Sequence, residues 1–216
     1  MLQLHYYPGT AAMTPHILLQ EMGVPFELVR VDRLADAHKA PAYLKLNPNG
    51  LIPVLTDGQL VLYETAAIVL YLCDTYQEAG LAPALGTVER AHFYKWLAWL
   101  TNTLQTTLLV YFYPERWVKE GNTAGAAEVK AQAQRKVGTL LDQLDGELAR
   151  HGGPWLLGEN YSAIDPFAMM LCRWTRGFPA APARSRPHLG PYLQRVLERP
   201  AVQRVFATEQ LAPPWV

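Results

Sequence analysis

Apolar residues alternate with polar ones in the first third of the chain, which predicts β-strands there. LQLHYY places Leu2, Leu4 and Tyr6 on one face of an extended segment, a period-two pattern typical of a strand. FELVRVD, PVLT and QLVL have the same character, and the Asp57-Gly58 dipeptide between the last two predicts a hairpin. The first third therefore predicts a small sheet of four strands.

Helical spacing separates these strands. Thr14 and Pro15 are expected to be the N-cap and the first residue of a helix that ends at Gly23. A short helix is expected near 43–46, and another over 65–76. An order of strand, helix, strand, helix, hairpin and helix predicts a mixed sheet flanked by helices.

The rest of the chain has helical spacing only. A long amphipathic helix is predicted over 88–119, with a break at Tyr113-Pro114. Later helices are expected over 126–150, 187–199 and 201–208. One more begins in YSAID, where Ser162 is expected as the N-cap and Asp165 at the third helical position.

These patterns predict two domains. Residues 1–78 form the α/β domain, 79–87 a linker rich in Gly, Ala and Pro, and 88–216 an all-α domain.

Composition excludes several classes of protein. The 216 residues are 50% hydrophobic and 18% charged, the balance of an ordinary globular protein. Lys plus Arg equals Asp plus Glu at 19 each, so no basic surface for nucleic acid is expected. No apolar run is long enough for a membrane span, and MLQLHYYPGT lacks the features of a secretion signal. We expect a cytoplasmic protein that binds neither membranes nor nucleic acid.

Cysteine usage agrees with that compartment. Cys73 and Cys172 lie far apart, each inside an apolar helical pattern, as expected of buried thiols in a reducing environment. The chain has no CxxC motif and no His/Cys cluster with metal-ligand spacing, so no metal is expected.

A proline interrupts the apolar run LIPVL. Pro53 cannot donate a hydrogen bond to a sheet, and such prolines are confined to strand starts, edges or bulges. If the Ile52–Pro53 bond is cis, the N–H and C=O of Ile52 point outward and can pair with an extended, peptide-like ligand. The alternative is that Pro53 only starts an edge strand.

Two further positions carry polar groups beside a helix start. Thr65 is expected to cap the helix after LYE, where free N–H groups favour a carboxylate, and Glu64 can hold an ammonium group. Together they could bind an α-amino acid head; alternatively they form an ordinary helix cap.

The turn YYPGTAAM is a third candidate, because a hydroxyl and helix N–H groups there could stabilise a thiolate. Because positions 10 to 12 are Thr, Ala and Ala, a thiol there must come with the ligand.

NPNGLIPVL through YETAAIVLYL resembles the glutathione-binding signature of cytosolic glutathione transferases, and GENYSAIDPFAM resembles the capping motif of their second domain. The opening YYPGTAAMTPHI is most similar to the bacterial beta class, although Ala11-Ala12 replaces its Cys-Ser. The resemblance covers essentially the whole chain. It implies a thioredoxin-like N-terminal domain, an all-helical C-terminal domain, and glutathione as co-substrate.

The resemblance also assigns roles to residues. The Ile52 backbone, ahead of cis-Pro53, would pair with the cysteinyl part of glutathione, and Glu64 and Thr65 would bind its γ-glutamyl head. His38 would bind the glycyl carboxylate, or else is a solvated loop residue.

Two residues compete to activate the thiol. Thr10 is the nearest hydroxyl to the place of an active serine in theta- and zeta-like members, and Tyr6 resembles the tyrosine of the mammalian-type classes. We favour Thr10; the alternatives are an ordinary turn residue at Thr10 and a core aromatic at Tyr6.

The electrophile is expected in the cleft between the domains, against the long helix. The candidates share helical spacing and a largely apolar character suited to a small-molecule pocket: Thr101, Leu104, Gln105, Leu108 and Tyr111. The alternative, which we favour for most of this stripe, is that these residues form helix-packing core.

The resemblance implies an enzyme that conjugates glutathione to small apolar electrophiles, as in detoxification. Two alternatives use the same scaffold: a glutathione-dependent disulfide reductase or isomerase, and a non-catalytic binding or interaction protein. Family resemblance also implies a homodimer, with which the expected exposure of Trp96 and Trp99 agrees loosely.

Overall fold

The computed structural model describes all 216 residues and divides into two compact units. Met1–Ala82 and Leu197–Pro213 make the N-terminal unit, and Pro83–Val196 with Pro214–Val216 makes the helical unit. This division differs from the predicted ranges 1–78, 79–87 and 88–216 near the end of the chain, where residues expected in the all-α domain belong to the N-terminal unit.

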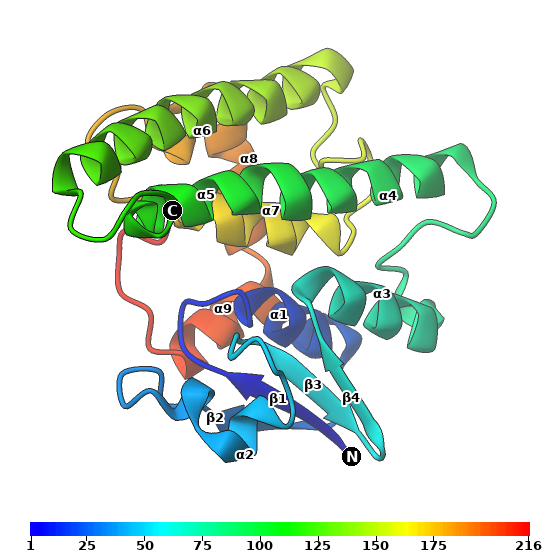
Figure 1. The fold of residues 1–216 in the computed structure, drawn as a ribbon. Coiled ribbons are helices and arrows are strands. Elements are labelled where there is room, and N and C mark those ends of the chain that lie inside the picture. The colour runs from blue at the N-terminus through cyan, green and yellow to red at the C-terminus, as the bar shows by residue number, and fades with distance from the viewer. The chain divides into compact units, whose positions relative to one another are not determined.

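The N-terminal unit is built on a four-stranded mixed sheet in the order β2-β1-β3-β4 (Figure 1). β1 (Leu2–Tyr6) pairs in parallel with β2 (Phe26–Arg30) and antiparallel with β3 (Val54–Asp57), which pairs antiparallel with β4 (Leu60–Tyr63). The four predicted strands are confirmed. β3 begins directly after Pro53, as expected of a proline that has no N–H to donate.

Strand alternation separates the two faces of this sheet. Leu4 and Leu55, which are paired across β1 and β3, are fully buried on one face. On the other face, Val54 and Tyr63 pack with Tyr43 in a separate apolar cluster. The second face of the sheet therefore packs against the segment before Pro53, which carries Tyr43.

Helices complete the N-terminal unit: α1 (Met13–Met22), α2 (Pro41–Leu44), α3 (Thr65–Thr75) and α9 (Pro200–Thr208). Short 3-10 helices cover Ala37–Lys39 and Gln77–Ala79. The predicted cap at Thr14 is wrong, because α1 already begins at Met13 with Ala12 at its N-cap position. The predicted stop is confirmed: Gly23 ends α1 with φ 65°, a left-handed conformation that favours glycine.

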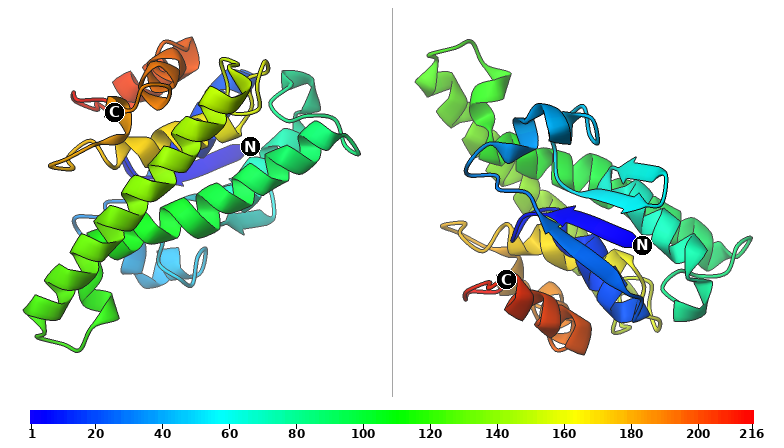
Figure 2. Two further views of the ribbon diagram at one scale, coloured as in Figure 1. Left: turned by 90° about the horizontal axis from the view of Figure 1, so that it is seen from above. Right: turned by 90° about the horizontal axis from the view of Figure 1, so that it is seen from below.

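α9 explains why the end of the chain belongs to the N-terminal unit. It lies beside α1 (Figures 1 and 2), and the Arg199 guanidinium donates to the Glu21 carboxylate at 2.9 Å. Arg204 Nε donates to Gln20 Oε1 at 3.0 Å. Apolar periodicity predicts that such a helix exists but does not say which domain it packs against.

The helical unit contains α4 (Val88–Trp99), α5 (Thr106–Phe112), α6 (Thr123–His151), α7 (Ile164–Arg173) and α8 (Leu189–Leu197). A π-helical stretch, Leu100–Gln105, joins α4 to α5, and 3-10 turns cover Pro114–Trp117 and Ala183–Ser185. The predicted break at Tyr113-Pro114 is confirmed. Trp96, expected to be exposed, is 3% exposed and packs edge-on against Trp99.

The start of α7 differs by one residue from its prediction. The N-cap position is Ala163, not Ser162. The Asp165 carboxylate still accepts the Ser162 N–H at 2.7 Å, together with the Leu156 N–H and the Tyr192 hydroxyl, each at 2.9 Å. A fully buried carboxylate with three such donors satisfies its hydrogen bonds inside the unit.

Both cysteines are buried free thiols, as predicted. Burial raises the pKa of the Cys172 thiol to about 12, so this thiol is protonated at neutral pH. No helix combines the length and the apolar character needed to cross a membrane.

Candidate functional site

Three segments meet at one edge of the sheet in the N-terminal unit. Val54 opens β3 and pairs with Tyr63, the last residue of β4, and also with His5 near the end of β1. The segment before β3, the segment after β4 and the turn after β1 therefore leave the sheet at the same edge. This edge brings together Ile52 and Pro53, Glu64 and Thr65, and the turn that carries Thr10.

The Ile52–Pro53 peptide bond is cis. Neither the N–H nor the C=O of Ile52 takes part in the hydrogen bonds of the sheet or of the surrounding loop. The preceding carbonyl, that of Leu51, is held by two donors: the Tyr43 hydroxyl at 2.8 Å and Asn47 Nδ2 at 2.9 Å. The loop is thus fixed at Leu51, and the backbone polar groups of the next residue stay available to a ligand.

Tyr43 and Asn47 are positioning residues that sequence reasoning missed. Burial raises the pKa of Tyr43, which keeps its hydroxyl protonated and able to donate. Asn47 is 2% exposed, and its Oδ1 accepts the Asn49 N–H at 3.0 Å while its Nδ2 donates to Leu51. The NPNG motif was the available signal, because Asn side chains commonly bond to nearby backbone in turns.

Helix α3 begins at the second of the three segments. Thr65 is its first residue and Glu64 occupies the N-cap position without a side-chain capping bond, so the prediction that Thr65 caps the helix is wrong. The first intrahelical donor is the Ile68 N–H, which bonds to the Glu64 carbonyl at 3.0 Å. The N–H groups of residues 65–67 therefore precede the intrahelical hydrogen bonds, at the positive end of the helix.

Glu64 has an unusual backbone conformation, with φ 73° and ψ 115°. A non-glycine residue at positive φ is strained, and such residues cluster at binding and catalytic sites. The Glu64 side chain is exposed, whereas Thr65 is only 6% exposed. This end of α3 can accept an anion at its N–H groups and a cation at the neighbouring carboxylate.

His38 lies in the 3-10 helix Ala37–Lys39, beside the loop that precedes Leu51. A Cβ added to Gly50 would lie 3.1 Å from the His38 carbonyl oxygen, which shows how closely the two segments approach. Burial lowers the pKa of His38, so at neutral pH its imidazole offers an N–H rather than a positive charge. Its predicted role at a glycyl carboxylate stays a prediction.

The turn after β1 carries the two rival hydroxyls. Thr10 Oγ1 donates to the Tyr7 carbonyl at 2.7 Å and accepts the Ala12 N–H at 3.4 Å. The Tyr6 ring packs edge-on against the His16 ring, with centroids 5.9 Å apart. Thr10 must therefore release the Tyr7 carbonyl before its single hydroxyl hydrogen can reach a ligand.

The predicted electrophile residues have different environments in the helical unit. Leu104 and Leu108 are fully buried, which agrees with the helix-packing alternative. Thr101 and Gln105 are partly exposed, and Thr101 Oγ1 donates to the Leu97 carbonyl at 2.9 Å. Tyr111 is partly exposed and stacks on Phe178, with ring centroids 4.4 Å apart.

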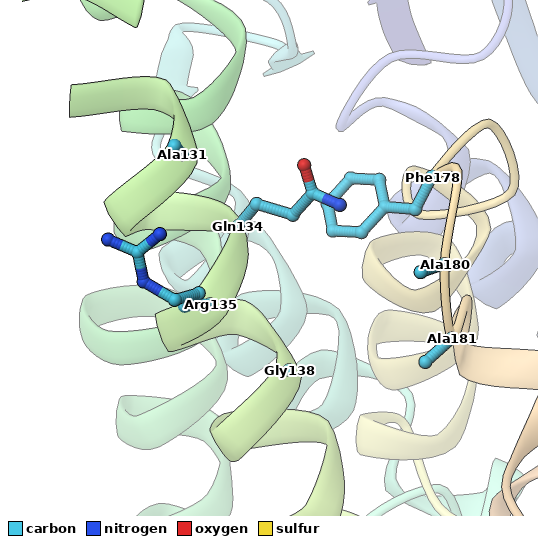
Figure 3. Close-up of a pocket in the computed structure, with 7 residues that line it drawn as sticks. All are labelled: Ala131, Gln134, Arg135, Gly138, Phe178, Ala180 and Ala181. Carbon is cyan, nitrogen blue, oxygen red and sulfur yellow. The ribbon is translucent and has the colours of Figure 1, made fainter. Parts of the chain in front are cut away.

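A cavity of about 370 Å³ lies between α6 and the loop after α7, and Phe178 is one of its lining residues (Figure 3). Gln134 and Phe178 point toward one another across it, and Arg135 and Ala181 also line it. A second cavity, of about 450 Å³, is bordered by Thr103, Thr107 and Val129. None of the five predicted electrophile residues lines either cavity.

The structure contains no group of three or more His, Cys, Asp or Glu side chains that could hold a metal ion.

The fold consists of an α/β thioredoxin-like domain followed by an all-helical domain. Two family models match the chain, "Glutathione S-transferase, N-terminal domain" over residues 10–75 and "Glutathione S-transferase, C-terminal domain" over residues 99–200. The chain belongs to the glutathione S-transferase family.

Individual relatives are similar to this chain over nearly its full length. The glutathione S-transferase GST-4.5 of Xanthomonas campestris is 30% identical over 210 residues, which are 97% of this chain and 100% of the relative. A glutathione transferase homologue from Sulfitobacter, solved with bound glutathione, is 27% identical with a TM-score of 0.88 and covers 98% and 99% of the two chains. A sphingomonad glutathione S-transferase in complex with glutathione is 32% identical with a TM-score of 0.82, covering 97% and 100%.

Proposed function

We propose that this chain is a glutathione transferase that binds glutathione at the sheet edge, stabilises its thiolate and conjugates it to small apolar electrophiles. One observation carries the proposal. The free backbone groups of Ile52 and the N-terminal end of α3 with Glu64 lie at one edge of the sheet, next to the turn that carries Thr10. Glutathione needs three such elements: a backbone partner, a receptor for its amino acid head and a donor to its sulfur.

The proposed binding mode uses charge as well as shape. The α-carboxylate of the γ-glutamyl group accepts from the N–H groups at the start of α3 and from the Thr65 hydroxyl, and its ammonium group pairs with Glu64. The cysteinyl part pairs with the N–H and C=O of Ile52, as an added strand pairs with a sheet edge. His38 donates to the glycyl carboxylate.

The proposed chemical step is attack by the thiolate. A donor near the sulfur stabilises the anion and lowers the thiol pKa, which raises the fraction of nucleophile at neutral pH. We assign this donor to Thr10, which exchanges its bond to the Tyr7 carbonyl for one to the sulfur. Tyr6 is the rival, although its ring packs against His16.

The electrophile is proposed to contact the helical unit through the partly exposed residues of the predicted stripe, Thr101, Gln105 and Tyr111. Two free buried cysteines and the similarity to bacterial enzymes favour a cytoplasmic location. We also propose a homodimer, which gel filtration tests: elution at the 24.2 kDa of one chain contradicts it.

Parallel assays test the proposed activity. The protein is supplied with glutathione and either a panel of aryl and alkyl electrophiles or a small mixed disulfide. Conjugation of an electrophile supports the transferase. Turnover of the disulfide alone assigns the chain to glutathione-dependent disulfide reduction, and binding of glutathione without turnover of either class indicates a non-catalytic binding protein.

A further inference from the structure

Glu209, the residue that follows α9, reaches the turn after β1. One of its carboxylate oxygens accepts the Gly9 N–H at 2.8 Å, and the other lies 2.9 Å from His16 Nδ1. The His16 and Glu209 side chains are both fully buried. A residue about two hundred positions away in sequence is thus bonded both to the turn after β1, through Gly9, and to α1, through His16.

Burial makes the Glu209 carboxylate depend on hydrogen-bond donors from the protein. A carboxylate removed from water is strongly disfavoured unless donors replace its solvation. Gly9 and His16 supply those donors, so the position of the carboxylate and the positions of its two partners depend on one another. A displaced turn would leave Glu209 without the Gly9 N–H.

The contact is not needed merely to join α9 to α1. Arg199 already binds Glu21, and Arg204 binds Gln20, both near the C-terminal end of α1. Glu209 acts at the opposite end of α1, where the turn enters the helix. The chain therefore provides a matched control, the ion pair between Glu21 of α1 and Arg199, the residue before α9, which does not touch the turn.

Both candidate donors to the sulfur are adjacent to the partners of Glu209. Gly9 directly precedes Thr10 and has φ 71°, so its amide orientation helps to set where the Thr10 side chain lies. The His16 ring packs against the Tyr6 ring. Fixing Gly9 and His16 consequently restrains whichever hydroxyl meets the thiol.

We infer that Glu209 is a positioning residue for thiol activation, which holds the turn 7–10 in its working geometry through Gly9 and His16. The inference rests on the proposed function, because it names a residue that supports the same site. Glu209 does not touch the bound glutathione in this account; it acts through its two partners.

Three substitutions separate positioning from folding. Glu209→Ala removes both bonds, and Glu209→Asp keeps the charge but is too short to reach both partners. Glu209→Gln can keep both: its carbonyl accepts the Gly9 N–H, and its NH2 group donates to His16 Nδ1 once the imidazole proton moves to Nε2. Glu21→Ala is the control, because it breaks the ion pair between α1 and Arg199 and leaves the bonds of Glu209 in place.

The readouts are the thiol pKa of bound glutathione, from the ultraviolet absorbance of the thiolate, and kcat and KM. We expect Glu209→Ala and Glu209→Asp to raise the thiol pKa and to lower kcat about tenfold, with little change in KM for glutathione, as misplacement of a reacting group does. Glu209→Gln should restore most of the wild-type thiol pKa, and 15N NMR should show the changed His16 tautomer. Glu21→Ala should lower thermal stability while the thiol pKa stays at the wild-type value.

Amide hydrogen exchange at residues 9 and 10 provides a readout that needs no glutathione. Faster exchange in Glu209→Ala than in Glu21→Ala supports the inference. Equal exchange, or equal effects of the two variants on the thiol pKa, overturns it. If the wild-type protein forms no thiolate with glutathione, the proposed function fails, and the exchange comparison still decides whether Glu209 holds the turn.

Discussion

Val54 and Tyr63 form the cross-strand pair that ends the β3–β4 hairpin, and Pro53 and Glu64 lie immediately outside it. The register of this hairpin thus fixes the spacing between the Ile52 backbone and the start of α3. A shift of one residue would move every side chain to the other face, so the fully buried Leu55, paired with the partly buried Leu62, keeps the register and thereby the geometry of the site.

The start of α3 should determine affinity for glutathione. Thr65→Ala removes a hydroxyl that hydrogen-bonds a charged carboxylate in the proposed complex, an interaction of about 1.5–3 kcal/mol, so affinity should fall roughly 10- to 100-fold. Thr65→Ser keeps the hydroxyl and should bind within about a factor of a few of wild type. Calorimetric titration with glutathione checks this; equal affinity of the Ala and Ser variants would contradict the role.

Glu64→Gln tests the receptor for the ammonium group separately. The variant keeps the size and an acceptor oxygen but loses the charge, so we expect weaker binding of glutathione. An analogue without the γ-glutamyl amino group should bind both proteins about equally. A similar loss for both ligands would indicate that Glu64 acts on the backbone of the segment and not on the ammonium group.

Thr10 and Tyr6 can be compared directly. Thr10→Ala should raise the pKa of the bound thiol by about one unit, equivalent to about 1.4 kcal/mol, whereas Thr10→Ser and Tyr6→Phe should leave it near the wild-type value. The measurement is thiolate absorbance as a function of pH in the saturated complex. A pKa that rises only in Tyr6→Phe would transfer the role to Tyr6.

Asn47 should contribute both to the stability of the fold and to the affinity for glutathione. Asn47→Ala removes a buried donor to the Leu51 carbonyl and the acceptor of the Asn49 N–H, so the free energy of unfolding should fall by about 1–3 kcal/mol. Since the same bond fixes the residue before Ile52, glutathione affinity should fall as well. Denaturant unfolding and calorimetry on the same sample measure both, and lost stability with unchanged affinity would limit Asn47 to a structural role.

Stability at acid pH should depend on Asp145 in the helical unit. Partial burial raises the pKa of this carboxyl, but the backbone N–H groups of Leu189 and His188, each at 2.8 Å, outweigh burial and lower its pKa overall. A lowered folded-state pKa contributes stability above the unfolded value of about 3.9 and loses it as pH falls through the folded value. Asp145→Asn should therefore be less stable at neutral pH and lose less stability on acidification, as measured by denaturant unfolding from pH 7 downward.

Local patterns predicted much of the fold and part of the site. The alternation of LQLHYY and the proline of LIPVL were enough to predict β1 and the start of β3, because each depends on residues close in sequence. The proline alone left the cis bond open, and the family resemblance implied it. The family resemblance grouped Ile52 with Glu64, and the predicted hairpin between them brings their segments together. These predictions needed no knowledge of distant contacts.

Long-range contacts account for most of what was missed. Nothing near Glu209 indicates that its carboxylate reaches Gly9, and apolar spacing could not assign α9 to the N-terminal unit. The cap predictions at Thr14 and Thr65 failed by small shifts in helix start, a boundary that local signals define to within a residue or two. Trp96 was expected to be exposed on the predicted helix, but its side chain packs inside the helical unit.

Calorimetric titration of glutathione in two buffers with different ionisation enthalpies tests whether the protein binds glutathione as the thiolate. Binding at a thiolate-stabilising site should release protons near neutral pH, so the apparent enthalpy with glutathione should depend on the buffer, whereas S-methylglutathione, which has no thiol, should bind without that dependence. Absence of glutathione binding at millimolar concentration, or equal proton release with the two ligands, would show that the protein does not stabilise the thiolate of glutathione.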